Sequence, residues 1–209
     1  MRTLLSIFLL CFATAGFAQD LTPDQLVQKV TEEVLATIKA DKQLASGDKQ
    51  KALKLAEEKV LPHIDFEEAT RLAVGRAWAQ ATPEQKKKLV DEFRRMLVRT
   101  YSNAIEAYSG QTLKVLPSRG APKDDDATVR TQFIRAGGQP LPIDFQARKT
   151  DKGWKIYDIT VEGVSLVLTY RSEFDQVVKQ EGMEGLIKRL SQKNTPAAVG
   201  STAPAPTKK

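Results

Sequence analysis

Histidine and carboxylate side chains are the first candidates for catalysis in this sequence, and most of them have a simpler structural explanation. His63 is the only histidine, and no Gly-x-Ser-x-Gly motif is present that could supply a nucleophile for it. Since a nucleophile needs a base held within hydrogen-bond reach, we interpret His63 as a loop residue without a chemical role. Asp65, Glu67 and Glu68 fit the first turn of a helix, whose dipole stabilises negative charge, and the aspartates at 124–126 fit a solvated turn.

Asp158 differs from these carboxylates because its neighbours in the sequence are apolar. A buried carboxylate needs a partner, and Arg148 or Arg171 could provide one. We therefore favour a structural ion pair over a catalytic acid at Asp158. The sequence also lacks a glycine-rich phosphate loop and the residue spacing of a metal site. These observations predict a protein that is not an enzyme and that has no metal and no cofactor.

The composition of the 209 residues is that of a globular protein, with 41% hydrophobic and 28% charged residues. This balance excludes a disordered chain, a collagen-like repeat and a membrane protein with several spans. One cysteine and one histidine exclude a disulfide scaffold and a Cys/His zinc site. The formal net charge of +6 is the unusual value, and it suggests an anionic partner.

Residues 1–18 have the features of a secretory signal peptide. A positively charged start precedes an apolar run, and Gly16 and Ala18 occupy the small-residue positions of a cleavage site. Cleavage after Ala18 removes the only cysteine, and export without a disulfide suggests a bacterial periplasmic protein. We expect one domain over residues 19–193, followed at 194–209 by a disordered tail rich in Pro and Ala.

Basic residues are concentrated in one segment that is expected to be helical: Lys86, Lys87, Lys88, Arg94, Arg95 and Arg99. Charges on a helix usually form a solvated face. The alternative is contact with a membrane surface or with an acidic protein. Because the protein is expected to be exported, nucleic acid is not an expected partner.

Helical and two-residue periodicities together predict an α+β fold. Thr22-Pro23 and Thr82-Pro83, each followed by Gln at the third helical position, signal two helix starts, and Asp65 signals a third, with Glu68 reaching back to cap it. The predicted helices span about residues 23–38, 48–61, 66–78 and 83–110, and the helical period returns over 164–190. The predicted strands are 113–115, 129–133, 141–147 and 154–161, with turns at 124–126 and 137–138.

The segment 154–161 is apolar on both of its predicted faces. Simple alternation places Trp154 and Ile156 on one face, and Tyr157, Ile159 and Val161 on the other. A strand buried on both faces belongs in the middle of a sheet. We therefore expect a twisted antiparallel sheet with helices packed onto one face of it.

Five aromatic side chains fall on faces that are predicted to turn inward: Trp78, Tyr101, Tyr108, Trp154 and Tyr157. Packing in a core explains most of them. Several inward tyrosines and tryptophans also suit a cavity with an apolar floor and a wet mouth. Both interpretations stay open at this point.

Four segments resemble the MlaC, or toluene-tolerance, family: RAWAQATPEQKKKLVDEF (76–93), RTYSNAIEAYSGQ (99–111), GWKIYDITVEGVSLVLTYRSEF (153–174) and EGMEGLIKRLSQKN (181–194). The resemblance implies an NTF2-like cone of sheet and helices that encloses a deep apolar pocket for acyl chains. It implies a monomeric periplasmic shuttle of Gram-negative bacteria, which carries phospholipid and maintains outer-membrane lipid asymmetry. The implied partners are an outer-membrane lipoprotein–porin complex and an inner-membrane ABC transporter with a lipid-binding hexamer.

We expect apolar and aromatic side chains of the helices and the sheet to contact the lipid: Leu72, Trp78, Leu97, Tyr101, Ile105, Phe133, Phe145, Trp154, Tyr157, Ile159, Val164 and Leu168. As many as half of them can be plain core, because core and pocket share one apolar pattern. Tyr101 and Tyr157 suit the mouth, since a phenol can face glycerol esters. Two other functions stay open: a carrier of another apolar ligand, and an adaptor between envelope complexes that binds no lipid.

Overall fold

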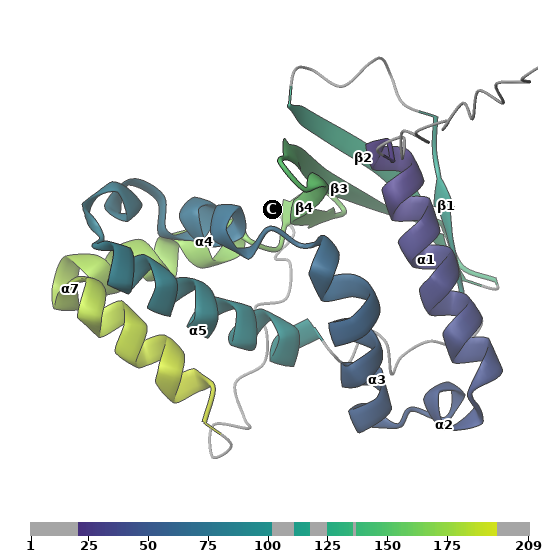
Figure 1. Ribbon diagram of the computed structural model, residues 1–209, viewed down its shortest axis with the longest axis horizontal. Coiled ribbons are helices and arrows are strands. Elements are labelled where there is room, and N and C mark those ends of the chain that lie inside the picture. Colours follow the sequence, from purple (N-terminus) through teal and green to yellow (C-terminus); the bar gives the residue numbers. More distant parts are fainter. Residues whose placement is uncertain (1–20, 102–110, 118–124, 136, 196–209) are drawn as a thin grey trace, which may run out of the picture.

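The computed structural model describes residues 21–101, 111–117, 125–135 and 137–195, and it has the expected α+β composition (Figure 1). Its helices are α1 (Pro23–Ala40), α2 (Lys42–Ala45), α3 (Lys49–Leu55), α4 (Phe66–Val74), α5 (Pro83–Tyr101) and α7 (Arg171–Lys193). Its strands are β1 (Thr112–Val115), β2 (Asp126–Ile134), β3 (Leu141–Thr150), β4 (Gly153–Val161) and β5 (Val164–Ser165). The predicted signal peptide, the predicted helix end at Gly110 and residues 196–209 lie outside the described residues.

Threonine–proline pairs begin α1 and α5, as predicted. Before α1, the Gln25 N–H donates to Thr22 Oγ1 at 3.3 Å, and the Thr22 N–H donates to Gln25 Oε1 at 2.9 Å. Thr82 and Gln85 repeat this arrangement before α5, at 3.2 and 3.0 Å. Each capping box satisfies two backbone donors that a helix start leaves unpaired. The local sequence therefore determines where both helices begin.

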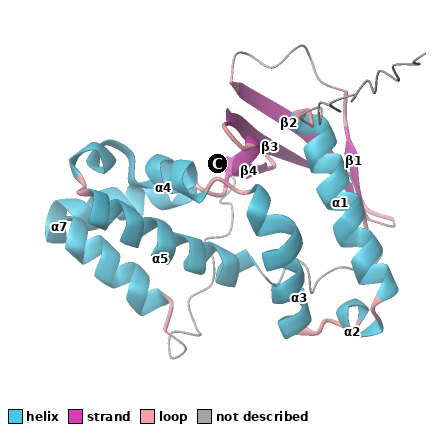
Figure 2. Ribbon diagram, viewed as in Figure 1, coloured by secondary structure: helices cyan, strands magenta, loops and turns pink. Residues whose placement is uncertain are grey.

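The strands form an antiparallel sheet in the order β1-β2-β3-β4-β5 (Figure 2). The connection from β4 to β5 is the dipeptide Glu162-Gly163, with φ of 49° and 83°. Positive φ at both central residues is the geometry of the tight hairpin turn that matches the twist of the strands. Neighbours in the sequence are thus neighbours in the sheet, which confirms the predicted antiparallel arrangement.

Strand β4 lies between β3 and β5, as expected for an internal strand, but it is second from the edge of the sheet rather than at its centre. It pairs along its length with β3, whereas the two-residue β5 pairs only with Thr160 and Val161. An isolated bridge from Ile64 to Ile156 covers another part of the same edge. The edge of β4 is therefore closed in two short stretches rather than by a full strand.

A register shift at Tyr157 explains why β4 looks apolar on both faces. Ile159 lies opposite Phe145 and Ile156 lies opposite Ala147, so Tyr157 has no opposite residue in β3. Phe145 and Ala147 are two residues apart and point to one face of the sheet, so Ile156 and Ile159 share that face. The predicted separation of these two isoleucines is wrong because the extra residue reverses the alternation, as in a β-bulge.

The two faces of the sheet differ in polarity. One cross-strand row is apolar and consists of Val129, Phe145 and Ile159. Val27 of α1 packs in the same cluster, and α1 lies across this face of the sheet (Figure 1). The neighbouring row, which points to the other face, is polar and consists of Arg130, Asp144 and Thr160. Burial under α1 therefore fixes which face of the sheet carries its core.

A second core lies within the layer formed by α4, α5 and α7, beside the sheet (Figure 1). At its centre Phe93, Tyr170 and Phe174 pack with ring centroids 5.3 to 5.7 Å apart, and two of the three pairs meet edge to face. Such aromatic pairs contribute about 0.5–1.5 kcal/mol beyond the area that they bury. The helical layer therefore has its own packed centre, separate from that of the sheet.

Helix α7 is broken at Gly182, where φ is 69° and ψ is −173°. Lys193 Nζ lies 2.6 Å from Glu173 Oε1 near the other end of α7. Twenty residues of straight helix would span about 30 Å, so the chain doubles back at Gly182 into two arms (Figure 1). The helix also begins later than the predicted Val164, because Val164 and Ser165 form β5 instead.

Glu68 of α4 joins this helix to the sheet. Arg71 Nε donates to Glu68 Oε2 at 2.7 Å, and Arg148 Nη1 of β3 donates to the same oxygen at 2.8 Å. Asp65 caps α4 as predicted, by accepting the Glu68 N–H at 2.9 Å. The predicted capping role of the Glu68 side chain is wrong, because its carboxylate turns to the two arginines. The hydrogen bond from Arg71 holds the pKa of Glu68 below its ordinary value, although burial opposes this shift.

We expect Glu68→Gln to lower the free energy of unfolding at pH 7 by about 1–3 kcal/mol, because hydrogen bonds to a charged group are lost. A lowered folded-state pKa stabilises the protein above the ordinary value of 4.5, and this contribution is lost as the pH falls below it. The difference between wild type and variant should therefore be smaller at pH 4 than at pH 7, as measured by urea unfolding. The exposed Glu67→Gln is the control. An equal difference at both pH values would contradict the role assigned to Glu68.

Candidate functional site

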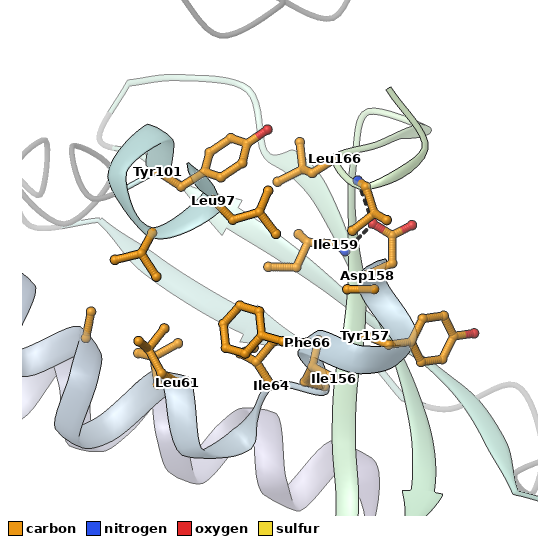
Figure 3. Close-up of a pocket in the computed structure, with 15 residues that line it drawn as sticks. Leu61, Ile64, Phe66, Leu97, Tyr101, Ile156, Tyr157, Asp158, Ile159 and Leu166 are labelled. Carbon is orange, nitrogen blue, oxygen red and sulfur yellow. Dashed lines mark hydrogen bonds between the residues drawn. The ribbon is translucent and has the colours of Figure 1, made fainter. Parts of the chain in front are cut away.

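An apolar pocket of about 290 Å³ lies between α5, β4 and the segment that leads from α3 to α4 (Figure 3). Its described lining residues are Ala56, Val60, Leu61, Ile64, Phe66, Ala69, Leu97, Val98, Tyr101, Ile156, Tyr157, Asp158, Ile159, Leu166 and Val167. Asp158 is the only acidic or basic side chain among these residues. A pocket with such a lining suits hydrocarbon, and it offers few partners to a polar ligand.

Helix α5 contributes Leu97, Val98 and Tyr101 to one wall. Residues three and four positions apart lie on one face of a helix, which is why these three side chains reach the same space. Tyr101 is partly buried, and burial, followed by the neighbouring Tyr170, raises the pKa of its phenol. Tyr101 therefore stays neutral at physiological pH and adds no charge to this wall.

An irregular helical segment forms the wall below α5 in Figure 3. Helix α3 continues as a π-helical turn, Ala56–Val60, and then as a 3₁₀ turn, Leu61–His63. A π turn inserts an extra residue and re-aims the side chains around it, and such turns are frequent at functional sites. The Asp65 N–H then donates to the Ile156 carbonyl at 2.7 Å, which fixes this wall against β4.

Strand β4 supplies the wall opposite α5. Ile156 and Ile159 point into the pocket toward Phe66 and Leu97 (Figure 3). The Tyr157 ring points away from them, and its hydroxyl donates to Asp126 Oδ2 at 3.0 Å. Burial, and then this hydrogen bond, raises the pKa of Tyr157. The register shift at Tyr157 thus gives the pocket two isoleucines and turns the phenol outward.

Asp158 holds the last wall in place. Its Oδ1 accepts the N–H groups of Ile159 at 2.8 Å and Val167 at 3.1 Å, and its Oδ2 accepts the Ser165 hydroxyl at 2.5 Å. The predicted ion pair with Arg148 or Arg171 is wrong, because hydroxyl and backbone donors satisfy this carboxylate. Asp158 is 6% exposed, and burial raises its pKa although these hydrogen bonds oppose the shift. It fixes Leu166 and Val167, which line the pocket.

Four of the predicted lipid-contacting residues line the pocket: Leu97, Tyr101, Tyr157 and Ile159. Two others belong to the helical core: Leu72 and Trp78. Three lie in the sheet and are not among the described lining residues: Phe133, Phe145 and Trp154. Val164 lies in β5, Leu168 is 43% exposed, and Ile105 lies outside the described residues. Contact with lipid stays a prediction for all of them.

The residues that were not predicted come from irregular or small positions. Val60, Leu61 and Ile64 surround the proline that ends the predicted second helix, and this apolar cluster at a helix break was the available signal. Ala56, Ala69 and Val98 carry no signal of their own, because small apolar residues at helical spacing are typical of any core. Leu166 and Val167 depend on Asp158, whose backbone partners cannot be read from side-chain types.

His63 lies in the 3₁₀ turn, partly buried, and burial followed by the nearby Lys155 lowers its pKa. Within the described ranges, no group of three or more His, Cys, Asp or Glu side chains could hold a metal ion. Nor does any helix in the described part of the chain have the length and apolar character needed to cross a bilayer.

We expect Asp158→Asn to destabilise the protein by about 1–3 kcal/mol, because an amide cannot accept all of the hydrogen bonds that the carboxyl group accepts. Because the pKa of Asp158 is raised in the folded state, its contribution to stability is fully present below the ordinary value of 3.8. This stabilisation is lost as the pH rises through the folded-state pKa. The free energy of unfolding that the variant loses should therefore be larger at pH 4 than at pH 7. This pH dependence is the reverse of the one expected for Glu68→Gln. Urea unfolding tests this, with the exposed Asp151→Asn as control, and a larger loss at pH 7 would refute it.

Sequence comparison connects the chain with known proteins. A profile of the family described as "MlaC protein" matches residues 28–192. The "Intermembrane phospholipid transport system binding protein MlaC" of Haemophilus influenzae is 23% identical over 194 residues, which cover 91% of this chain and 91% of the relative. The "Toluene tolerance protein ttg2D" of Pseudomonas putida is 24% identical over 162 residues, which cover 77% of this chain and 75% of the relative.

A solved structure has a similar fold. It is that of a phospholipid-binding protein from Ralstonia solanacearum in complex with a phospholipid, and it is 37% identical in sequence. The superposition has a TM-score of 0.76 and covers 85% of this chain and 99% of that one. With the family profile matching most of the sequence, the predicted resemblance is confirmed: the chain belongs to the MlaC family.

Proposed function

We propose that this protein is a periplasmic phospholipid carrier that holds acyl chains in the apolar pocket and moves lipid between the outer and inner membranes. This transport would maintain the lipid asymmetry of the outer membrane. The observation that carries the proposal is the pocket itself, with Asp158 as the only acidic or basic residue among its described lining residues. The related protein from Ralstonia solanacearum, which was solved with a phospholipid, supports the choice of ligand.

The hydrophobic effect explains why such a carrier must bury the chains. Two acyl chains contain about 30 methylenes, and exposing each to water costs roughly 0.8 kcal/mol, or about 24 kcal/mol in total. This exceeds the roughly 18–21 kcal/mol at which non-covalent affinities saturate. A phospholipid therefore does not cross water alone at a useful rate. The carrier must bury the chains and release them at a membrane, which requires a lower affinity in the docked state.

The pocket is small for a diacyl phospholipid. Pockets for drug-sized ligands have volumes of roughly 300–1,000 Å³, and this pocket has about 290 Å³. A diacyl phospholipid is larger than such ligands. One wall, with Leu97 and Tyr101, belongs to the helical layer, and another, with Ile156 and Ile159, belongs to the sheet. We infer that movement between the layer and the sheet widens the pocket while each core stays packed.

Export and partners are part of the same proposal. Residues 1–18 would direct the chain into the periplasm. There the carrier would act as a monomer between an outer-membrane lipoprotein–porin complex and an inner-membrane ABC transporter with a lipid-binding hexamer. The name of the Haemophilus influenzae relative, which refers to an intermembrane phospholipid transport system, supports transport between membranes.

Organic extraction of the purified protein, followed by mass spectrometry, tests the proposed ligand. We expect phospholipid in an amount comparable to that of the protein. Recovery of another apolar compound in place of phospholipid would favour a different carrier function. A protein that contains no lipid and takes none up from vesicles would be an adaptor, and the proposal would be wrong.

A charge within the pocket should prevent lipid binding. We expect Leu97→Glu to reduce bound phospholipid at least tenfold, because an unpaired carboxylate in an apolar site costs several kcal/mol. Leu21→Glu adds the same charge at a leucine that is 38% exposed and is not among the described lining residues of the pocket, and it should keep normal lipid occupancy. Lipid is quantified by mass spectrometry after circular dichroism has verified the fold. If Leu97→Glu does not fold, Ile159→Trp, which fills the pocket without a charge, replaces it. Full occupancy in a folded pocket variant would refute the assignment.

A further inference from the structure

A second hollow adjoins the apolar pocket. It has a volume of about 440 Å³, and its described lining residues are Leu53, Glu57, Leu61, Asp91, Arg94, Arg95, Val98 and Arg99. Leu61 and Val98 line both the hollow and the apolar pocket. The two spaces are therefore neighbours that share these side chains as a wall. The apolar pocket thus has a charged neighbour on one side, with three arginines and two carboxylates among its described lining residues.

Arg94 connects the charged hollow with the apolar pocket. It precedes Leu97, Val98 and Tyr101 by three, four and seven residues, so it lies on the same face of α5 as these pocket residues. Its guanidinium carbon lies 5.4 Å from the centroid of the Phe66 ring, and Phe66 lines the apolar pocket. The pocket-lining side chains of α5 are therefore followed, one turn toward its N-terminus, by a cation that lies against Phe66, an aromatic wall of the pocket.

Arg94 differs from the other two arginines of this hollow. Arg95 pairs with Glu92 at 2.8 Å, and Arg99 donates to the Asn194 and Thr195 carbonyls at 3.0 and 3.2 Å. In the part of the chain that the structure describes, no carboxylate lies within ion-pair distance of Arg94. Among the same described residues, the Arg94 guanidinium also donates no hydrogen bond to another residue, and it contacts Phe66 through the ring. Its N–H donors are therefore available to an anion.

We propose that Arg94 binds the phosphodiester of the lipid whose acyl chains occupy the apolar pocket; this inference rests on the proposed function. In a phospholipid only a few bonds separate the acyl esters from the phosphate, so buried chains place an anion close to the rim. A guanidinium can donate two parallel hydrogen bonds to a phosphate, which a lysine cannot do. Glu57 and Asp91 also face the hollow, so its charge is mixed and the affinity for a free anion is low.

The test compares two ligands that share the same chains, dioleoylphosphatidylglycerol and dioleoylglycerol. Delipidated protein is loaded from detergent micelles, and the bound ligand is quantified by mass spectrometry. Wild type should prefer the phospholipid roughly tenfold, the size of one charge-assisted interaction. Arg94→Gln should lose this preference while it binds dioleoylglycerol normally. Lys88→Gln removes one charge from an exposed position of the same helix and should behave as wild type.

The outcomes separate this inference from the proposed function. If wild type binds neither ligand, the proposed function is wrong and the inference is wrong with it. If wild type binds both equally, or if Arg94→Gln weakens both equally, the carrier function stands and the phosphate contact is refuted. Inorganic phosphate is the probe for the other source of the anion. Saturable phosphate binding to delipidated wild type that Arg94→Gln abolishes would identify a free-anion site and overturn the assignment to lipid.

Discussion

The register shift in β4 determines what the sheet offers to the pocket. Without this shift, regular alternation would place Ile156 and Ile159 on opposite faces of the sheet. Only one of the two isoleucines would then line the pocket. Because Tyr157 has no opposite residue in β3, both isoleucines face inward and the tyrosine reaches Asp126. The same shift places Asp158 where it can accept the N–H of Val167. One extra residue in β4 thus determines which isoleucines line the pocket, where the Tyr157 hydroxyl binds, and how Asp158 holds Val167.

The pocket lies at the junction of two packed units rather than inside either of them. The sheet has its core under α1, and the helical layer has its core around Phe93 and Phe174. Between these cores, Glu68 and Arg148 connect α4 to β3 through charged hydrogen bonds. These hydrogen bonds hold the helical layer in a defined position against the sheet. Because each core lies within its own unit, the proposed widening of the pocket would leave both cores packed.

Local features were predictable from the sequence because they depend on near neighbours. The capping boxes at Thr22 and Thr82 and the order of the strands follow from hydrogen bonds and turns within a few residues. The partners of Asp158 were not predictable, because they include backbone donors that every residue type provides. The division between pocket and core was not predictable either. Trp78 and Leu97 belong to the same kind of apolar pattern in the sequence. Only the three-dimensional structure shows that Trp78 is buried in the helical core and that Leu97 lines the apolar pocket.

The break in α7 at Gly182 also decides where the end of the helix, with the following Asn194 and Thr195, lies. Because the two arms run side by side, Asn194 and Thr195 come to α5, where Arg99 and Glu92 bind them. In a continuous helix, Lys193 would instead lie about 30 Å from Glu173, far from its present position. Arg99, which binds this end of α7, is only two residues before the pocket residue Tyr101 in α5. A fluorophore attached at Thr195 would consequently lie beside Arg99 and report on the charged hollow that Arg99 lines.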